Sequence, residues 1–227
     1  MTICLEGHAS LAKNERPPSG PWQCIHSENT FFTTLFTLVF WDILFPIKLD
    51  SSEEDKDWKE LGTFLTPYQM APLDLTFSCL FYARRKSAID QRLQEVLEDS
   101  PCVQKETSFL LQLLQKHYSL HYGTLAIGIC WESFPNLSEF LQIVSSFPLS
   151  SIVSILQVFV KNYKAARKGF PDLLLWKQEA DRMSNDDCHV LLVEVKGPSD
   201  TLSDDQRFWL DYLSKEAHLP VRICKII

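Results

Sequence analysis

Apolar residues in the first two-thirds of the chain recur at the spacing of helices. The strongest apolar run, Phe31–Phe45, is shorter than the ~20 residues that span a bilayer and contains Asp42. It therefore predicts a buried helix that ends at Pro46, and no membrane partner is expected. Four further helices are predicted, at residues 73–99, 106–121, 136–147 and 150–166. The first of them is interrupted at Arg84, Arg85 and Lys86, where two helices can meet.

The pattern changes after Gly169. Residues 172–176 and 190–195 are short apolar runs rich in β-forming side chains, which indicates two strands. Helical spacing returns in residues 203–218, where Ser203 and Gln206 form a capping-box pair, and residues 221–227 predict a last strand.

The predicted fold class is therefore α+β (α/β), with a helical N-terminal region packed on a small β-β-α-β core. We divide the chain into a polar N-terminal segment (1–20), a helical region (21–166) and the core itself (167–227).

Composition narrows the class of protein. The chain has 227 residues, 45% hydrophobic and 22% charged, which is typical of a globular protein. Its formal net charge of −7 excludes a polycation, so any nucleic acid must be bound through a local basic surface and metal ions. The seven cysteines never form a C-x-x-C pair, which favours reduced thiols over a disulfide framework or a zinc site.

The residues that suggest chemistry lie on the two predicted strands. Asp172 begins the first strand, and Glu194 and Lys196 are two apart on the second, so their side chains leave the same face. If the strands pair as a hairpin, the two carboxylates converge, and a hard cation such as Mg²⁺ relieves their repulsion. Lys196 then lies beside the metal-bound water, where it can stabilise negative charge. Taken alone, E-x-K is commonly the solvated face of a strand; its conjunction with P-D favours catalysis.

These motifs resemble a known family. Residues 169–173 (GFPDL), followed by 193–210 (VEVKGPSDTLSDDQRFWL), are similar to the VRR-NUC branch of the PD-(D/E)XK nuclease superfamily, and within it to the Fanconi-associated nucleases. The resemblance extends upstream to residues 25–45 and 72–85. It implies a restriction-endonuclease-like core.

The resemblance also implies roles for individual residues. Asp172 and Glu194 would be catalytic metal ligands and Lys196 the catalytic lysine. Glu28 would be a further acidic ligand, delivered by the buried helix. The main-chain carbonyl of Val195 would face the metal, and Gln206 would support the site.

The activity that the resemblance implies is DNA cleavage with Mg²⁺ or Mn²⁺. The expected actions are 5′-flap endonuclease and 5′-to-3′ exonuclease cleavage in interstrand cross-link repair, in the nucleus. The expected partner is branched or flapped DNA. Two alternatives stay open: a non-catalytic DNA- or partner-binding fragment, because the upstream regions of the family are absent from this chain, and a nuclease that resolves four-way junctions.

Two basic clusters are candidates for phosphate contacts. The first precedes the predicted strand that carries Asp172 and consists of Lys161, Lys164, Arg167 and Lys168. Lysines that compensate a helix dipole explain this cluster equally well. The second, Arg84 and Arg85, interrupts the second predicted helix. His117 and His121 are four apart without a nearby acid, and they are expected on the surface.

Overall fold

The computed structural model describes residues 3–6, 22–46, 63–66, 68–76, 80–99, 108–177 and 189–226. The chain divides into two compact units. The first comprises residues 1–31, 138–155 and 168–227, and the second comprises residues 32–137 and 156–167. Each unit is assembled from separate segments, so two stretches of the region predicted to be helical belong with the C-terminal core.

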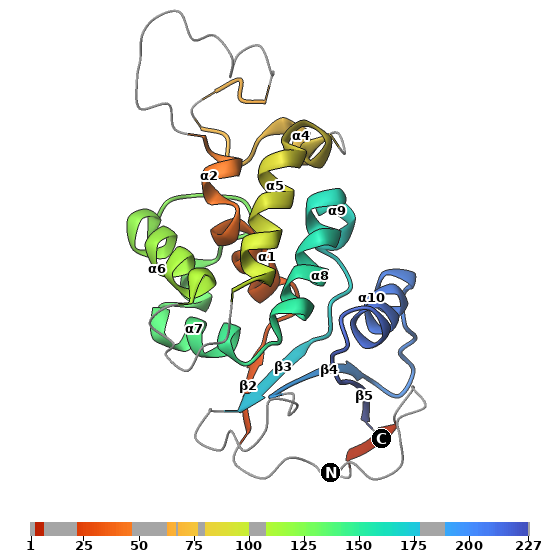
Figure 1. The fold of residues 1–227 in the computed structure, drawn as a ribbon. Coiled ribbons are helices and arrows are strands. Elements are labelled where there is room, and N and C mark those ends of the chain that lie inside the picture. The colour runs from red at the N-terminus through yellow and green to blue at the C-terminus, as the bar shows by residue number, and fades with distance from the viewer. Residues whose placement is uncertain are drawn as a thin grey trace, which may run out of the picture. The chain divides into compact units, whose positions relative to one another are not determined.

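A five-stranded sheet is the centre of the first unit (Figure 1). Its strands lie in the order β1-β5-β4-β3-β2, and only β4 and β5 are parallel. Their bounds are Ile3–Glu6 (β1), Trp22–His26 (β2), Leu173–Lys177 (β3), Val190–Lys196 (β4) and Val221–Ile226 (β5). The three C-terminal strands agree with the predicted runs.

Strand β2 corrects one expectation. The sequence predicts a helical region from residue 21, but residues 22–26 form a strand that pairs antiparallel with β3. Gln23, Cys24 and His26 are exposed on this edge strand. An edge strand of this kind carries no apolar run, and its partner lies far away in the sequence.

Helices α7 (Leu137–Ser145), α8 (Leu149–Lys161) and α10 (Asp204–Lys215) accompany the sheet, with the first part of α8 in this unit. Helix α10 packs against β5 (Figure 1). It begins with the predicted capping box of Ser203 and Gln206. Its Trp209 is buried and contacts Phe170, with ring centroids 3.9 Å apart. The contact of Trp209 with Phe170 fixes α10 relative to the segment that leads into β3.

The second unit is helical. Its elements are most of α1 (Thr30–Val39), α2 (Trp41–Leu44), α4 (Leu73–Thr76), α5 (Phe81–Leu97), α6 (Phe109–His121), the 3-10 turn Trp131–Ser133, the end of α8 and α9 (Tyr163–Ala166). The predicted helix 31–45 is divided at Phe40. The predicted interruption of helix 73–99 is confirmed, because α4 and α5 are separate and Arg85 has non-helical angles (φ −120°, ψ 19°).

Helix α1 carries buried threonines whose hydroxyl groups are hydrogen-bonded to main-chain oxygens. Thr33 donates to the main-chain oxygen of Gly128 at 2.8 Å, and Thr37 donates to that of Ile127 at 2.7 Å. A buried hydroxyl is costly unless it is bonded, and both bonds meet that need.

The expectation of surface histidines is wrong for His117. Its side chain is buried in α6, and Nδ1 lies 2.6 Å from the main-chain oxygen of Leu38. Burial is the main cause of the lowered pKa of His117. His121 stacks on Trp41, with ring centroids 4.1 Å apart. Both imidazoles therefore serve packing in this unit.

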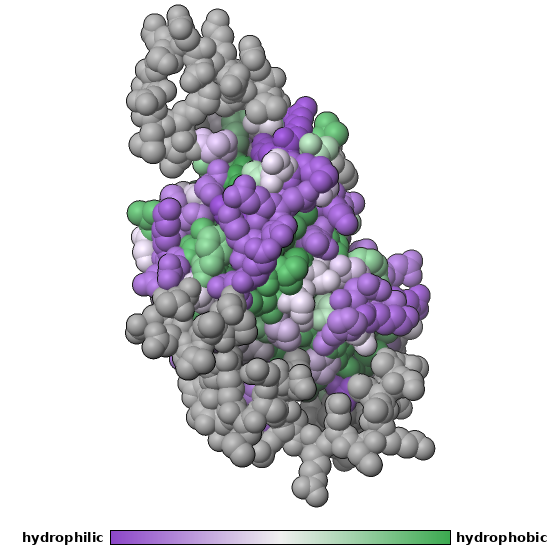
Figure 2. Space-filling model, in the orientation of Figure 1, coloured by the Kyte–Doolittle hydropathy of each residue, from purple (hydrophilic) through white to green (hydrophobic). Residues whose placement is uncertain are grey.

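Hydrophilic side chains gather over α5 and α10 in the space-filling view (Figure 2). In the part of the chain that the structure describes, no single helix is long and apolar enough to cross a bilayer; α7 and α8 reach that length and composition only when joined across their 105° bend.

Candidate functional site

The site begins where β3 and β4 separate. Leu173 pairs with Val193, so the antiparallel register places Asp172 opposite Glu194. Beyond the last pair, Oδ2 of Asp172 accepts a hydrogen bond from the main-chain N–H of Val195 at 2.7 Å. The Asp172 side chain thus takes the place of a main-chain acceptor at the end of the hairpin, and its carboxylate is held in a fixed orientation. The predicted pairing of the two strands is confirmed.

Glu194, Lys196 and Gln206 form one hydrogen-bonded network. The ammonium of Lys196 lies 2.9 Å from Oε1 of Glu194 and donates to Oε1 of Gln206 at 3.0 Å. Nε2 of Gln206 donates to the same Glu194 oxygen. The strand therefore presents Glu194 and Lys196 on one face, as predicted, and α10 supplies the group that bridges them.

Glu194 is the most deeply buried acid of this site, with 1% of its side chain exposed. Burial raises the pKa of Glu194, the charge of Asp172 acts in the same direction, and the hydrogen bond from Lys196 opposes both. Its Oε1 accepts two bonds, but Oε2 has no hydrogen-bond partner among the described residues. An unpartnered carboxylate oxygen in a buried position is costly, and a bound ion or water is one way in which such an atom is satisfied.

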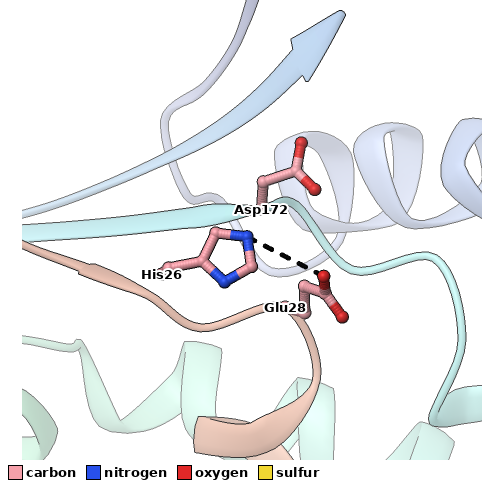
Figure 3. A group of neighbouring side chains, drawn as sticks. All are labelled: His26, Glu28 and Asp172. Atoms are coloured by element: carbon pink, nitrogen blue, oxygen red, sulfur yellow. Dashed lines mark ion pairs between the residues drawn. The ribbon is translucent and has the colours of Figure 1, made fainter.

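A second group of donors lies at the end of β2. One ligand atom each from His26, Glu28 and Asp172 falls within 4.8 Å of the others (Figure 3). Nε2 of His26 is 3.8 Å from Oε1 of Glu28, and both side chains are more than half exposed. Main-chain bonds hold this arrangement, because Ser27 N–H and Glu28 N–H donate to the carbonyl oxygen of Asp172 at 2.9 and 3.3 Å.

The position of Glu28 differs from the predicted one. Glu28 does not lie in the buried helix but in the turn between β2 and α1, with φ of 39°. The main-chain bonds to Asp172 require this turn, and a left-handed conformation is uncommon for glutamate. The turn brings Glu28 to Asp172, so the predicted neighbourhood holds although the element that provides it is different.

Gly169 allows the loop before β3 to approach α10. It has φ of +80°, and a Cβ at this position would lie 2.5 Å from the carbonyl carbon of Asp205 and 2.7 Å from the nitrogen of Gln206. Only glycine accepts both the conformation and the contact. The close approach keeps Gln206, and through it Lys196, at the end of the hairpin.

The donor set fits a divalent cation. Two carboxylates and an imidazole offer ligand atoms within 4.8 Å of one another, and Glu194, opposite Asp172 in strand register, has a buried oxygen without a hydrogen-bond partner among the described residues. Carboxylate oxygens suit Mg²⁺ and Mn²⁺, and imidazole is a ligand of transition ions. The main-chain carbonyl of Val195, predicted as a further ligand, belongs to the strand residue that also donates to Asp172.

The predicted phosphate-binding residues fall into two groups. Lys161, Lys164, Arg167 and Lys168 are all exposed, at the end of α8, on α9 and in the turn that follows. Arg84 and Arg85 both contact the buried carboxylate of Asp74, at 3.4 and 2.6 Å. That ion pair within the second unit explains the two arginines without any nucleic acid, and their contact with DNA stays a prediction.

Sequence reasoning does not single out two residues that the sheet places beside proposed site residues. His26 precedes Glu28 by two positions, a spacing that becomes informative only once residues 22–26 are known to form a strand. Lys225 pairs in register with Lys196 on the neighbouring parallel strand, so both lie on the same face of the sheet. No local signal in the sequence reveals that pairing.

Comparison with known proteins connects this arrangement to one family. Residues 105–226 match the family model described as "VRR-NUC domain". The chain is 33% identical to Fanconi-associated nuclease 1 of Danio rerio over 99% of its own length, and 32% identical to the homolog of Arabidopsis thaliana over 91%. It covers only 20% of each of these relatives, so it spans about a fifth of their length.

A solved structure shares the fold. The crystal structure of paFAN1 bound to 2nt 5′ flap DNA with gap matches with a TM-score of 0.71 over 91% of this chain and 32% of that one, at 24% identity. At this identity the match supports the fold alone. The predicted family resemblance and the predicted mixed fold class are both confirmed.

Proposed function

The chain belongs to the VRR-NUC domain family, and on this basis we propose that it is a metal-dependent nuclease that hydrolyses phosphodiester bonds in structured DNA. The observation that carries the proposal is the ion pair of the buried Glu194 with Lys196, which lies opposite Asp172 at the end of the β3–β4 hairpin. One oxygen of Glu194 has no hydrogen-bond partner among the described residues. Together with Glu28, the C-terminal segment 167–227 is the proposed nuclease core.

The proposed metal ligands are Asp172, Glu194, Glu28 and the main-chain carbonyl of Val195. When bound, Mg²⁺ or Mn²⁺ supplies a Lewis acid that stabilises negative charge on the phosphoryl oxygens. Asp172 is suited to this role because the bond from the Val195 N–H fixes the orientation of its carboxylate. Glu194 is suited because its Oε2 is buried without a protein partner among the described residues.

Lys196 is the proposed catalytic cation. Its side chain is 12% exposed, and its ammonium is held between Glu194 and Gln206. A fixed positive charge shielded from water attracts the charge that develops on a phosphate more strongly than a mobile, solvated one. Gln206 acts as a positioning residue, because its amide bonds Lys196 and Glu194 at the same time.

The proposed substrate is branched or flapped DNA, cut by 5′-flap endonuclease and 5′-to-3′ exonuclease action in interstrand cross-link repair in the nucleus. The paFAN1 structure with the same fold carries 5′ flap DNA, which supports this choice. The exposed residues Lys161, Lys164, Arg167 and Lys168 are the proposed phosphate contacts.

A cleavage assay tests the proposal. The purified chain is incubated with labelled 5′-flap, single-stranded, duplex and four-way-junction DNA in Mg²⁺, Mn²⁺ or EDTA. Asp172→Asn and Lys196→Met are expected to lower the cleavage rate by about 100-fold or more. The matched control is Asp211→Asn, an exposed aspartate on α10 paired with Lys215, and it is expected to cut at the rate of the unaltered chain.

An alternative to the nuclease function follows from how little of its relatives the chain covers. Since it covers a fifth of its relatives, a non-catalytic fragment that binds DNA or a partner is the second candidate. A folded chain that cuts none of the four DNAs in either metal would establish that alternative. If Asp172→Asn cuts as fast as the unaltered chain, the cleavage does not depend on this site and the proposal is refuted. Preferential cutting of four-way junctions would instead identify a resolving nuclease.

A further inference from the structure

His26 stands out because the resemblance assigns it no role, yet it lies with two proposed metal ligands. It is the last residue of β2, and its imidazole shares a 4.8 Å cluster of donor atoms with Glu28 and Asp172 (Figure 3). The 3.8 Å separation of His26 Nε2 and Glu28 Oε1 exceeds the 2.7–3.2 Å of a hydrogen bond. The two groups form a long ion pair (Figure 3) and are not hydrogen-bonded to each other, so both can turn toward a shared ion.

The main chain, not the side chains, sets this cluster. Register pairs His26 with Leu173, and the N–H groups of Ser27 and Glu28 both donate to Asp172 O. These bonds fix the backbone positions of His26, Glu28 and Asp172 relative to one another. Only the side chains then have to be ordered when an ion binds, which favours a partly preorganised site.

A second observation comes from the other side of Asp172. Glu194 lies opposite Asp172 in the hairpin register, is almost completely buried, and has an oxygen without a partner among the described residues. Asp172 therefore belongs to both groups: it is one of the clustered donors, and strand register places it opposite the buried Glu194. His26 and Glu28 are exposed, so an ion can reach the cluster from solvent.

We propose that His26 is a direct ligand of the cation at Glu28 and Asp172, and that its imidazole makes this position prefer Mn²⁺ to Mg²⁺. This inference rests on the proposed metal-dependent nuclease function. Mg²⁺ binds oxygen ligands in a strict octahedron and retains several waters. An imidazole nitrogen is a ligand for first-row transition ions, and it sets a preference that two carboxylates alone do not provide.

The test uses Mn²⁺ alone as the probe, with the full chain and no DNA. Electron spin echo envelope modulation of the bound Mn²⁺ detects a directly coordinated imidazole nitrogen. The unaltered chain is expected to give this nitrogen signal, and His26→Asn is expected to lose it. Titration with Mn²⁺ is expected to show about tenfold weaker binding in His26→Asn, while the affinity for Mg²⁺ changes less than about twofold.

Two further variants sharpen the result. His218→Asn is the matched control: His218 is an exposed histidine with φ of 52°, a conformation that asparagine adopts readily, and it lies outside the cluster. It is expected to keep both the nitrogen signal and the affinity. His26→Thr removes the imidazole with a residue that favours strands, so its loss of signal separates ligation from an effect on β2.

The outcomes distinguish this inference from the proposed function. A nitrogen signal that persists in both His26 variants, or an unchanged ratio of Mn²⁺ to Mg²⁺ affinity, overturns the inference even if the chain cuts DNA. A His26-dependent nitrogen signal in a chain that cuts no DNA supports the inference and removes the proposed activity.

Discussion

Replacing Gln206 with methionine tests the network behind the site. The Gln206 amide donates to Glu194 and accepts from the Lys196 ammonium and from the Ser203 N–H, each of the latter at 3.0 Å. Methionine has similar length and helix propensity, so Gln206→Met removes these three bonds while the packing of α10 is retained. The cap from Ser203 Oγ to the main-chain N–H of residue 206 is untouched.

The expected loss follows from the exposure of each partner. The bond to Glu194 is to a charged group that is 1% exposed, and such bonds contribute about 1.5–3 kcal/mol. The Ser203 N–H lies at an exposed helix start and can bond water, so its loss costs about 0.5 kcal/mol. With a small contribution from Lys196, Gln206→Met should lower the free energy of unfolding by about 2–4 kcal/mol. In a domain of this size that is a Tm decrease of about 4–16 °C.

Urea denaturation in EDTA, followed by tryptophan fluorescence, measures this loss, because Trp176 and Trp209 are buried. The matched control is Gln91→Met, which removes only the exposed bond from Gln91 to Glu95 on α5. It should change stability by less than about 0.5 kcal/mol. If Gln206→Met also stays within that range, the amide is not a structural link between strand and helix, and the reasoning is refuted.

Three further predictions concern stability in the absence of metal. Gly169→Ala should lower the free energy of unfolding by about 2–3 kcal/mol, because the new methyl group meets α10 at a φ of +80°; a urea midpoint equal to that of the unaltered chain contradicts this. Burial raises the pKa of Glu194 above its unfolded value, so folding takes up a proton: its contribution is fully present below the unfolded pKa and is lost as pH rises through the folded one. Urea midpoints measured from about pH 8 to pH 4 in EDTA should therefore rise on acidification relative to Glu194→Gln, and parallel profiles for the two proteins would show that the pKa is not raised. Asp74→Asn leaves the largely buried Arg85 without its carboxylate and should cost about 3–5 kcal/mol. Asp90→Asn, which weakens the half-exposed pair of Asp90 with Lys86, should cost less than about 1 kcal/mol; similar thermal midpoints for the two variants would contradict the ion-pair argument.

Local signals in the sequence predict the elements of the β3–β4 hairpin and the helix beside it. The capping box of Ser203 and Gln206 needs only residues three apart, and the apolar runs of β3 and β4 are continuous because these strands lie inside the sheet. The E-x-K spacing correctly predicted that Glu194 and Lys196 share a face.

Nonlocal contacts limited the rest of the prediction. Strand β2 is a half-exposed edge strand without an apolar run, and pairing with residues distant in sequence determines its structure. Because the sequence gives no local signal for β2, its pattern places Glu28 in the helix and gives no reason to consider His26 a ligand. The burial of His117 was missed for the same reason, since its partner Leu38 lies on another helix.

The pairing of β2 with β3 also sets when the site can form during protein synthesis. Residues 22–26 leave the ribosome long before their partners at 173–177. At a translation rate of roughly 5–20 residues per second, β3 is synthesised on the order of ten seconds after β2. Glu28 and His26 reach Asp172 only after that interval, and Lys196 and Gln206 emerge later still. A nascent chain therefore carries the separate parts of the site without its geometry, and the acids meet only after β3 and β4 have both been synthesised.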